Sequence, residues 1–383
     1  MRASRLLPGL LPLALLLAAC QSGPPAGGPD AAPATTPPAT TTTIPVPVTT
    51  TACALPNLRR QLAQLLVVGF TGTEPDATAT APVKAGAGGV ILFKPNVQSA
   101  AQVKRLVAGL KDASGFRLSV GVDQEPGTKV ARLAGMVPAS PPARTLGRQD
   151  PAVIERTGRD LGRALKGLGI TVDYAPVLDV TGGSGVIGDR SFGADAATAG
   201  RAGTAFMRGL EAGGVLPVGK HFPGHGATSD DSHEALPTIS LGPGRLDREH
   251  VAPFRTAIKA GLPAVMVGHL RVEAVDPERP ASLSPEVVDG LLRHDLGFDG
   301  LVVTDAMEMG ALTDRWSIPE AAELALLAGV DQLLIGLPDP PVREVVDHLA
   351  AAVHAGRLER SRVREAFLRV QAIKGERRWA GCG

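Results

Sequence analysis

The 383-residue sequence has few aromatic residues, no excess of either charge and no long apolar run. It contains nine Phe, two Trp and one Tyr, which argues against a long groove lined with sugar-stacking rings and favours a compact ligand. Lys and Arg number 39 and Asp and Glu 38, so the net charge of +1 provides no field that would gather nucleic acid. We therefore expect no nucleic-acid partner.

The apolar run near the start of the sequence is too short to cross a membrane. Arg2 and Arg5 precede 14 mostly apolar residues, Leu6 to Ala19, whereas a spanning helix needs about 20. Residues 1–20 are therefore predicted to be a signal peptide. Leu17-Ala18-Ala19-Cys20 resembles the bacterial lipobox, which implies an exported protein held to the cell membrane by a lipid on Cys20. An ordinary secreted protein is the alternative.

Residues 21–53 are predicted to be a disordered linker. Positions 21–52 contain eight prolines and nine threonines, and Asp30 is the only charged residue among them. Such a segment cannot bury enough apolar area to offset the entropy lost on ordering, and its prolines favour an extended conformation. We therefore expect a spacer, followed by a single folded domain at 54–383.

The sequence has only three cysteines. If Cys20 carries lipid, Cys53 and Cys382 remain, one at each end of the predicted domain. Because export implies an oxidising compartment, we predict that these two cysteines form a disulfide bond. Two free thiols are the alternative.

Eight short apolar segments recur along the domain. They are continuous rather than alternating, as is typical of parallel strands covered on both faces. Helical spacing fills most of the intervals, and several helices are predicted to begin at an N-cap near a proline, as at Asp150, Ser284 and Ser317. The eight predicted strand segments are 65–70, 89–93, 118–123, 170–180, 216–221, 264–270, 301–306 and 331–336.

This alternation predicts an α/β fold, specifically a (β/α)8 TIM-type barrel with long loops. A doubly wound open sheet is the competing arrangement, but no Gly-x-Gly-x-x-Gly motif follows an early strand. Active sites of barrels lie at the carboxyl ends of the strands, and polar residues collect there in this sequence. They are Asp123, Asp179, Lys220, His221, His269 and Asp305.

Several motifs occur in a specific order along the domain. They are Gly121-Val122-Asp123-Gln124-Glu125, Tyr174-Ala175-Pro176-Val177-Leu178-Asp179, Asp189-Arg190-Ser191-Phe192-Gly193, Lys220-His221-Phe222-Pro223-Gly224-His225-Gly226, Asp231-Ser232-His233, Leu296-Gly297-Phe298-Asp299-Gly300 and Val303-Thr304-Asp305-Ala306-Met307-Glu308-Met309-Gly310. With them the sequence resembles bacterial glycoside hydrolase family 3, in particular its single-barrel β-N-acetylglucosaminidases. The resemblance extends from about Leu62 to the helix after Gly336.

The resemblance implies catalytic roles for three residues. Retaining hydrolysis requires a carboxylate near the anomeric carbon and a proton donor near the leaving oxygen. Asp305 at a strand end suits the nucleophile, and the resemblance implies that His233 is the acid/base and Asp231 its orienting partner. Asp305 as a helix cap and Glu308 as a rival donor are the alternatives.

The resemblance also implies sugar-binding residues, since charged side chains make strong hydrogen bonds to hydroxyls. They are Asp123, Arg132, Arg190, Lys220 and His221. Asp123 and Lys220 could instead form a structural ion pair. After Glu125 the chain reads Pro126-Gly127-Thr128-Lys129-Val130-Ala131-Arg132, where relatives usually have Gly-Gly-Arg-Val, and this departure changes the backbone that leads to Arg132.

We therefore expect a retaining exo-β-N-acetylglucosaminidase that removes terminal β-linked GlcNAc from small cell-wall-derived saccharides, as a monomer without cofactor or metal. A family 3 β-glucosidase or a glycoside phosphorylase is the nearest alternative. A non-catalytic sugar-binding lipoprotein and a metal-dependent hydrolase are more distant. The latter would use His221, His225, His233, Asp230 and Asp231, although Pro223, Gly224 and Gly226 exclude a helical His-Glu-x-x-His geometry.

Overall fold

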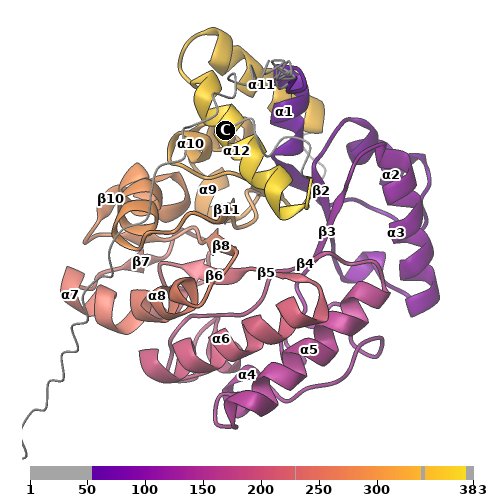
Figure 1. Ribbon diagram of the computed structural model, residues 1–383. Coiled ribbons are helices and arrows are strands. Elements are labelled where there is room, and N and C mark those ends of the chain that lie inside the picture. Colours follow the sequence, from indigo (N-terminus) through magenta and orange to yellow (C-terminus); the bar gives the residue numbers. More distant parts are fainter. Residues whose placement is uncertain (1–53, 229, 338–340, 377–383) are drawn as a thin grey trace, which may run out of the picture. The chain divides into compact units, whose positions relative to one another are not determined.

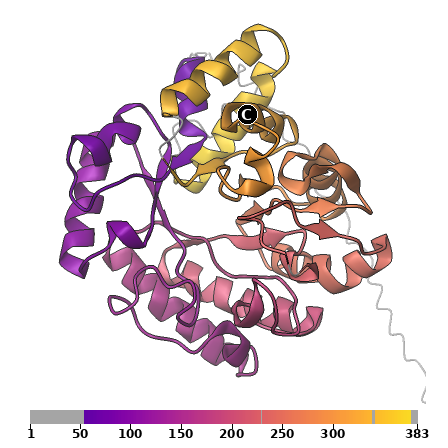
Figure 2. The ribbon, with the colours of Figure 1, turned by 180° about the vertical axis from the view of Figure 1, so that it is seen from behind.

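The computed structural model describes residues 54–228, 230–337 and 341–376. Cys20, Cys53, Cys382 and the predicted segments 1–20 and 21–53 lie outside the described residues. Most strands lie in the middle of the described unit with helices around them (Figures 1 and 2).

The strands are short. They are β1 (Leu66–Val68), β2 (Gly89–Leu92), β3 (Ser119–Val122), β4 (Val172–Asp173), β5 (Leu216–Pro217), β6 (Gly219–Phe222), β7 (Thr238–Ile239), β8 (Ala264–Val267), β9 (Arg271–Val272), β10 (Asp276–Pro280), β11 (Leu301–Thr304) and β12 (Leu333–Ile335). Each of the eight predicted segments contains at least one of these strands.

The helices alternate with the strands. The α-helices are α1 (Leu58–Gln64), α2 (Ala77–Lys84), α3 (Ala100–Ser114), α4 (Ala143–Leu146), α5 (Pro151–Gly167), α6 (Ala196–Gly213), α7 (Pro243–Arg245), α8 (Ala252–Lys259), α9 (Gly310–Thr313), α10 (Ile318–Leu327), α11 (Val342–His354) and α12 (Arg360–Ile373). Four short 3-10 helices are described: η1 (Lys94–Asn96), η2 (Gly188–Arg190), η3 (His225–Ala227) and η5 (Ala281–Leu283). Two segments are π-helices: η4 (Leu246–Val251) and η6 (Glu286–Asp295). Asp150 and Ser317 cap α5 and α10 as predicted, through Ala152 N and Glu320 N.

Parallel pairing confirms the predicted α/β class. One sheet has the order β12-β1-β2-β3-β4-β5, and a second has the order β11-β8-β6, with parallel partners throughout. A small third sheet, β10-β9-β7, was not predicted; its strands are short, and β10 begins Asp276-Pro277 and ends at Pro280. Strands of the two parallel sheets are fully buried almost throughout, which explains their continuous apolar character.

The two ends of the described domain pack together. Helices α1 and α12 lie side by side in both views (Figures 1 and 2), and the Gln64 side-chain oxygen accepts hydrogen bonds from Gln371 at 3.3 Å and from Lys374 at 3.0 Å. These contacts join the first and last helices across almost the whole sequence.

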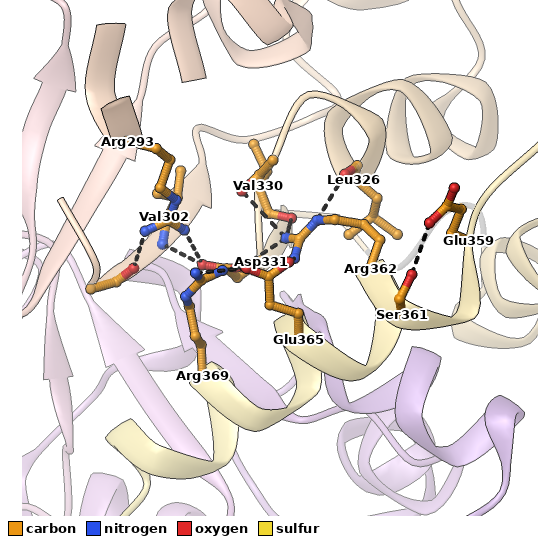
Figure 3. Close-up of polar contacts among 12 residues, drawn as sticks. Arg293, Val302, Leu326, Val330, Asp331, Glu359, Ser361, Arg362, Glu365 and Arg369 are labelled. Atoms are coloured by element: carbon orange, nitrogen blue, oxygen red, sulfur yellow. Dashed lines mark hydrogen bonds and ion pairs between the residues drawn. The ribbon is translucent and has the colours of Figure 1, made fainter. Parts of the chain in front are cut away.

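A buried carboxylate joins several elements near the start of β12. Asp331 accepts from Arg293 at 2.6 Å, Arg362 at 2.7 Å, Arg369 at 3.2 Å and the Val302 N–H at 3.0 Å (Figure 3). The arginines come from η6 and α12, and Val302 lies in β11. A fully buried carboxylate needs such partners, because an unpaired charge in the interior is costly. Asp331 thus fixes helices to the amino-terminal side of the sheet.

Candidate active site

A cavity of about 140 Å³ contains seven of the eight predicted catalytic and sugar-binding residues in its wall. These seven are Asp123, Arg132, Arg190, Lys220, His221, His233 and Asp305; the eighth, Asp231, contacts His233. Most follow the carboxyl ends of parallel strands, as a shared edge of the sheet would require. Residues separated by more than half of the domain are therefore brought to one place.

Asp305 directly follows β11. Its main-chain N–H continues the pairing to Val267 at 3.0 Å, and its carboxylate accepts the Ala306 N–H at 2.8 Å. Burial raises the pKa of Asp305, but the neighbouring His221 and the Ala306 N–H are among the groups that outweigh it and leave the pKa below its ordinary value. The residue is consequently ionised at neutral pH, as a nucleophile must be.

Asp231 and His233 form a dyad on the loop after β6. One Asp231 oxygen accepts from the His233 Nδ1 at 2.8 Å and from the His233 main-chain N–H at 3.0 Å. Burial raises the pKa of Asp231, but the two hydrogen bonds to His233 more than compensate and lower it. The carboxylate therefore holds the proton on Nδ1 and leaves Nε2 for other partners. The His233 side chain is 73% exposed, so it lies at the mouth of the cavity.

A compact ion network forms one wall. Glu125 accepts two hydrogen bonds from Arg190, at 2.7 and 2.8 Å, and pairs with Lys220 at 2.8 Å, while Lys220 also donates to Asp123 at 2.7 Å. Burial alone would raise the pKa of Glu125, but Lys220 and Arg190 lower it to about 2. The ion pair between Asp123 and Lys220, which was the alternative to sugar binding, is present, and both groups also line the cavity.

Glu125 was not among the predicted site residues. It is buried, whereas the cations that it orients line the cavity. The only sequence signal was its place next to a strand end, in the Asp123-Gln124-Glu125 motif.

Asp179, which does not line the cavity, orients two histidines that do. Its carboxylate accepts from His221 Nδ1 at 2.7 Å and from the His225 main-chain N–H at 2.6 Å. Burial raises the pKa of Asp179, but His221 brings it below its ordinary value. His269, also predicted at a strand end, is buried and contacts Ser282 at 2.7 Å and the Ala306 carbonyl at 3.0 Å. These two residues support the site without lining it.

The turn after β6 requires glycine at two positions. Gly224 has φ +134°, and a Cβ atom at Gly226 would lie 2.1 Å from the Val180 carbonyl oxygen. The turn thus packs against Val180, the residue next to Asp179, whose carboxylate contacts His221 and His225.

The departure after Glu125 is accommodated as a hairpin. The Glu125 N–H donates to the Val130 carbonyl at 2.9 Å, and Lys129 Nζ donates to the Val186 carbonyl at 3.1 Å. Arg132 beyond it lines the cavity; its Nε is buried without a hydrogen-bond partner, and its guanidinium lies 6.0 Å from the Phe93 ring centre. The altered backbone thus still brings Arg132 to the predicted place.

The rival donor Glu308 is not among the residues that line the cavity. Its carboxylate accepts the Gly336 N–H at 2.8 Å, and burial raises its pKa. Its carboxylate is thus committed to the backbone that follows β12.

The histidines of the alternative metal site have separate polar partners: His221 contacts Asp179, His225 contacts Ser232 and His233 contacts Asp231. Within residues 54–228, 230–337 and 341–376, no group of three or more His, Cys, Asp or Glu residues is arranged to hold a metal ion. In the same part of the chain, no helix combines the length and apolar character needed to cross a membrane.

Comparison with known proteins agrees with this geometry. Residues 57–373 match the "Glycosyl hydrolase family 3 N terminal domain". The sequence is 37% identical to "Beta-hexosaminidase LpqI" of Mycobacterium tuberculosis (strain ATCC 25618 / H37Rv) over 390 residues, covering 97% of this chain and 96% of that one. It is 35% identical over 307 residues to a "Beta-hexosaminidase" of Nitrosomonas eutropha (strain DSM 101675 / C91 / Nm57), covering 77% of this chain and 87% of that protein.

Solved structures give the same relationship. A glycoside hydrolase family 3 beta-N-acetylglucosaminidase from Paenibacillus sp. str. FPU-7 superposes with a TM-score of 0.81 at 38% identity, over 86% of this chain and 64% of that one. This chain therefore spans less than two thirds of that protein. "M tuberculosis LpqI" superposes with a TM-score of 0.77 at 39% identity, over 84% of this chain and 94% of that one.

Fold, site and relatives together define a glycoside hydrolase. The chain belongs to glycosyl hydrolase family 3, and the resemblance stated from the sequence motifs is confirmed.

Proposed function

We propose that this protein is a retaining exo-β-N-acetylglucosaminidase that hydrolyses terminal β-linked GlcNAc from small cell-wall-derived saccharides. The observation that carries the proposal is the presence of ionised Asp305 and of the dyad residue His233 in the wall of one cavity. The names of the relatives, beta-hexosaminidase and beta-N-acetylglucosaminidase, support the choice of sugar.

The reaction takes place in two displacements. In the first, an Asp305 oxygen bonds to the anomeric carbon, the glycosidic bond breaks, and protonated His233 gives its Nε2 proton to the leaving oxygen. In the second, His233 takes a proton from water as the water oxygen bonds to the anomeric carbon and the bond to Asp305 breaks. Asp231 stabilises the imidazolium through Nδ1 in both steps, so proton and charge are conserved over the cycle.

Five residues hold the terminal sugar. The carboxylate of Asp123 accepts from hydroxyl groups, while donors come from Lys220, Arg190 and Arg132. His221 presents Nε2 to the sugar, because its Nδ1 donates to Asp179. Among the described residues of the cavity wall, Phe93 is the single Phe, Tyr or Trp, which supports a site for one sugar residue rather than a stacked chain.

The parallel strands close into a (β/α)8 barrel in this proposal. Support comes from two single parallel bridges between the sheets: Val177 pairs with Lys220, and Val303 pairs with Gln332 next to β12. With β5 and β6 separated only by Val218, these bridges connect both edges of the six-stranded sheet to the three-stranded one. The cavity then lies at the carboxyl end of the barrel.

We also propose an exported monomer with a lipid on Cys20, a spacer at 21–53 and a catalytic domain at 54–383. The packing of α1 against α12 supports a Cys53–Cys382 disulfide, because it brings the first and last described helices together. Mass spectrometry of the non-reduced protein tests both modifications: a diacylated Cys20 peptide and a linked Cys53–Cys382 peptide are expected. Free thiols at Cys53 and Cys382 would contradict the disulfide.

The activity is tested with 4-nitrophenyl β-N-acetylglucosaminide. Asp305→Ala should abolish turnover, whereas Asp314→Ala, which removes an exposed carboxylate outside the cavity, should leave it unchanged. A 5-fluoro glycoside should label Asp305, and peptide mass spectrometry locates the adduct. Unchanged turnover in Asp305→Ala would overturn the nucleophile assignment. A preference for β-glucosides would favour a glucosidase, and a sugar 1-phosphate formed in phosphate buffer would favour a phosphorylase.

A further inference from the structure

The loop that carries the dyad contacts a histidine of the cavity wall, His225, that the proposed reaction does not use. Ser232 lies between Asp231 and His233, and its hydroxyl contacts His225 Nε2 at 3.1 Å. Both Ser232 and His225 are buried, whereas the His233 side chain is exposed to solvent. Ser232, His225 and His233 all line the same cavity, so the contact anchors the loop within the cavity wall, next to the dyad histidine.

The main chain of the same loop docks on the segment that follows Asp305. The Ser232 carbonyl accepts the Ala311 N–H, and the His233 carbonyl accepts the Gly310 N–H, each at 3.2 Å. A Cβ atom at Gly310 would lie 2.9 Å from the His233 carbonyl oxygen, so a larger residue at position 310 would clash with the loop backbone. The dyad is thus placed relative to the nucleophile by short-range contacts.

His225 is itself rigidly held. Its main-chain N–H donates to Asp179 at 2.6 Å, and its ring lies edge-on against the His221 ring, with centres 5.7 Å apart. Its Nδ1 is buried and has no hydrogen-bond partner, so the Ser232 hydroxyl is its only polar side-chain contact among the described residues. Burial lowers the pKa of His225, and His221 lowers it further, which keeps the ring neutral at pH 7.

We propose that His225 is a positioning residue that acts through the Ser232 hydroxyl to hold His233 where it can protonate the leaving oxygen. This inference rests on the proposed glycosidase function and assigns no chemistry to His225 itself. Proton transfer depends on direction and distance, and a misplacement of about 1 Å can reduce a rate by about 100-fold.

The role has a specific kinetic signature. Leaving groups of low pKa depart without a proton, whereas poor leaving groups need the acid. Loss of the anchor should therefore slow the hydrolysis of phenyl β-N-acetylglucosaminide far more than that of the 2,4-dinitrophenyl compound. General damage to the fold or to the sugar site would slow both substrates equally.

The experiment compares kcat/KM for both substrates in the full chain and its variants. His225→Ala should lower the value for the phenyl substrate by about 100-fold, with a much smaller loss for the dinitrophenyl substrate. His225→Gln, whose amide can contact the Ser232 hydroxyl, should recover most of the loss. Ser232→Ala should reproduce the effect, and the double alanine variant should be no worse than His225→Ala, because both changes remove one interaction.

The matched control is His250→Ala, which removes another buried imidazole, one that lies beside Gly224 of the same turn. It should show no dependence on the leaving group. If His225→Ala does not fold, as judged by circular dichroism, the positioning role is tested by the kcat/KM values of Ser232→Ala on the two substrates.

The outcomes separate this inference from the proposed function. If wild type hydrolyses both substrates and His233→Ala depends strongly on the leaving group, the acid assignment holds. Equal losses on both substrates in His225→Ala, or an unaffected Ser232→Ala, would then overturn the positioning role alone. If His233→Ala shows no such dependence, the proposed function fails and the positioning role fails with it.

Discussion

Removing the carboxylate of Asp331 should destabilise the domain strongly. Three guanidinium groups, from Arg293, Arg362 and Arg369, surround this fully buried side chain together with the Val302 N–H (Figure 3). Asp331→Ala leaves these largely buried cations without their shared anion, and breaking a buried ion pair in this way costs about 3–5 kcal/mol.

The structure points to the lower end of that range. Arg293 retains the Phe298 and Gly300 carbonyls as acceptors, and Arg362 and Arg369 retain Glu365. We therefore expect a loss of about 3 kcal/mol of unfolding free energy in Asp331→Ala. Asp331→Asn keeps an acceptor for the Val302 N–H and should lie between the alanine variant and wild type.

Urea unfolding followed by circular dichroism gives the measurement, as a shift in midpoint at constant slope. Asp347→Ala is the matched control, because this carboxylate is 48% exposed and pairs with exposed Arg59 and Arg343. Its loss should cost less than about 1 kcal/mol. If Asp331→Ala unfolds at the same midpoint as Asp347→Ala, the reasoning about the buried cluster is wrong.

Two further predictions concern pH. Despite burial, Lys220 and Arg190 hold the pKa of Glu125 at about 2, below its ordinary 4.5, so the ionised group stabilises the fold above about pH 5 and this stability is lost as the pH falls towards 2. In urea titrations Glu125→Gln should be less stable than wild type at pH 7, with the difference shrinking on acidification; a constant difference would contradict the assigned shift. Burial lowers the pKa of Lys374 from 10.5 to about 7, so wild type should lose stability as the pH falls from about 10.5 to 7. Lys374→Met should flatten this part of the profile and raise the urea midpoint at pH 7; a profile as steep as that of wild type would contradict the assigned shift.

The strands were predictable because burial on both faces produces continuous apolar runs. The run at 170–180 was predicted as one strand, but the strand is only Val172–Asp173, since Pro176 has no N–H to continue the ladder. The small sheet of β7, β9 and β10 escaped prediction because β7 and β9 have only two residues each and β10, Asp276–Pro280, is polar and contains two prolines.

The site was predictable where a residue ends a strand. Asp305 directly follows β11, Lys220 and His221 lie in the last three residues of β6, and all three line the cavity. The contact between His225 and Ser232 could not be foreseen, because it depends on how a glycine-rich turn folds back on its own loop. Likewise, a buried acid such as Glu125 is recognisable only once the cations around it are placed in space.

The residues proposed to bind and cleave the substrate are spread along the sequence from Asp123 to Asp305, so no single strand and its following helix contain them all. Catalytic activity therefore requires that early, middle and late segments of the domain are all folded together. During refolding from denaturant, the rate at which hydrolysis returns would report when the last of these segments folds into place. The circular dichroism signal would return earlier, because helices form much sooner.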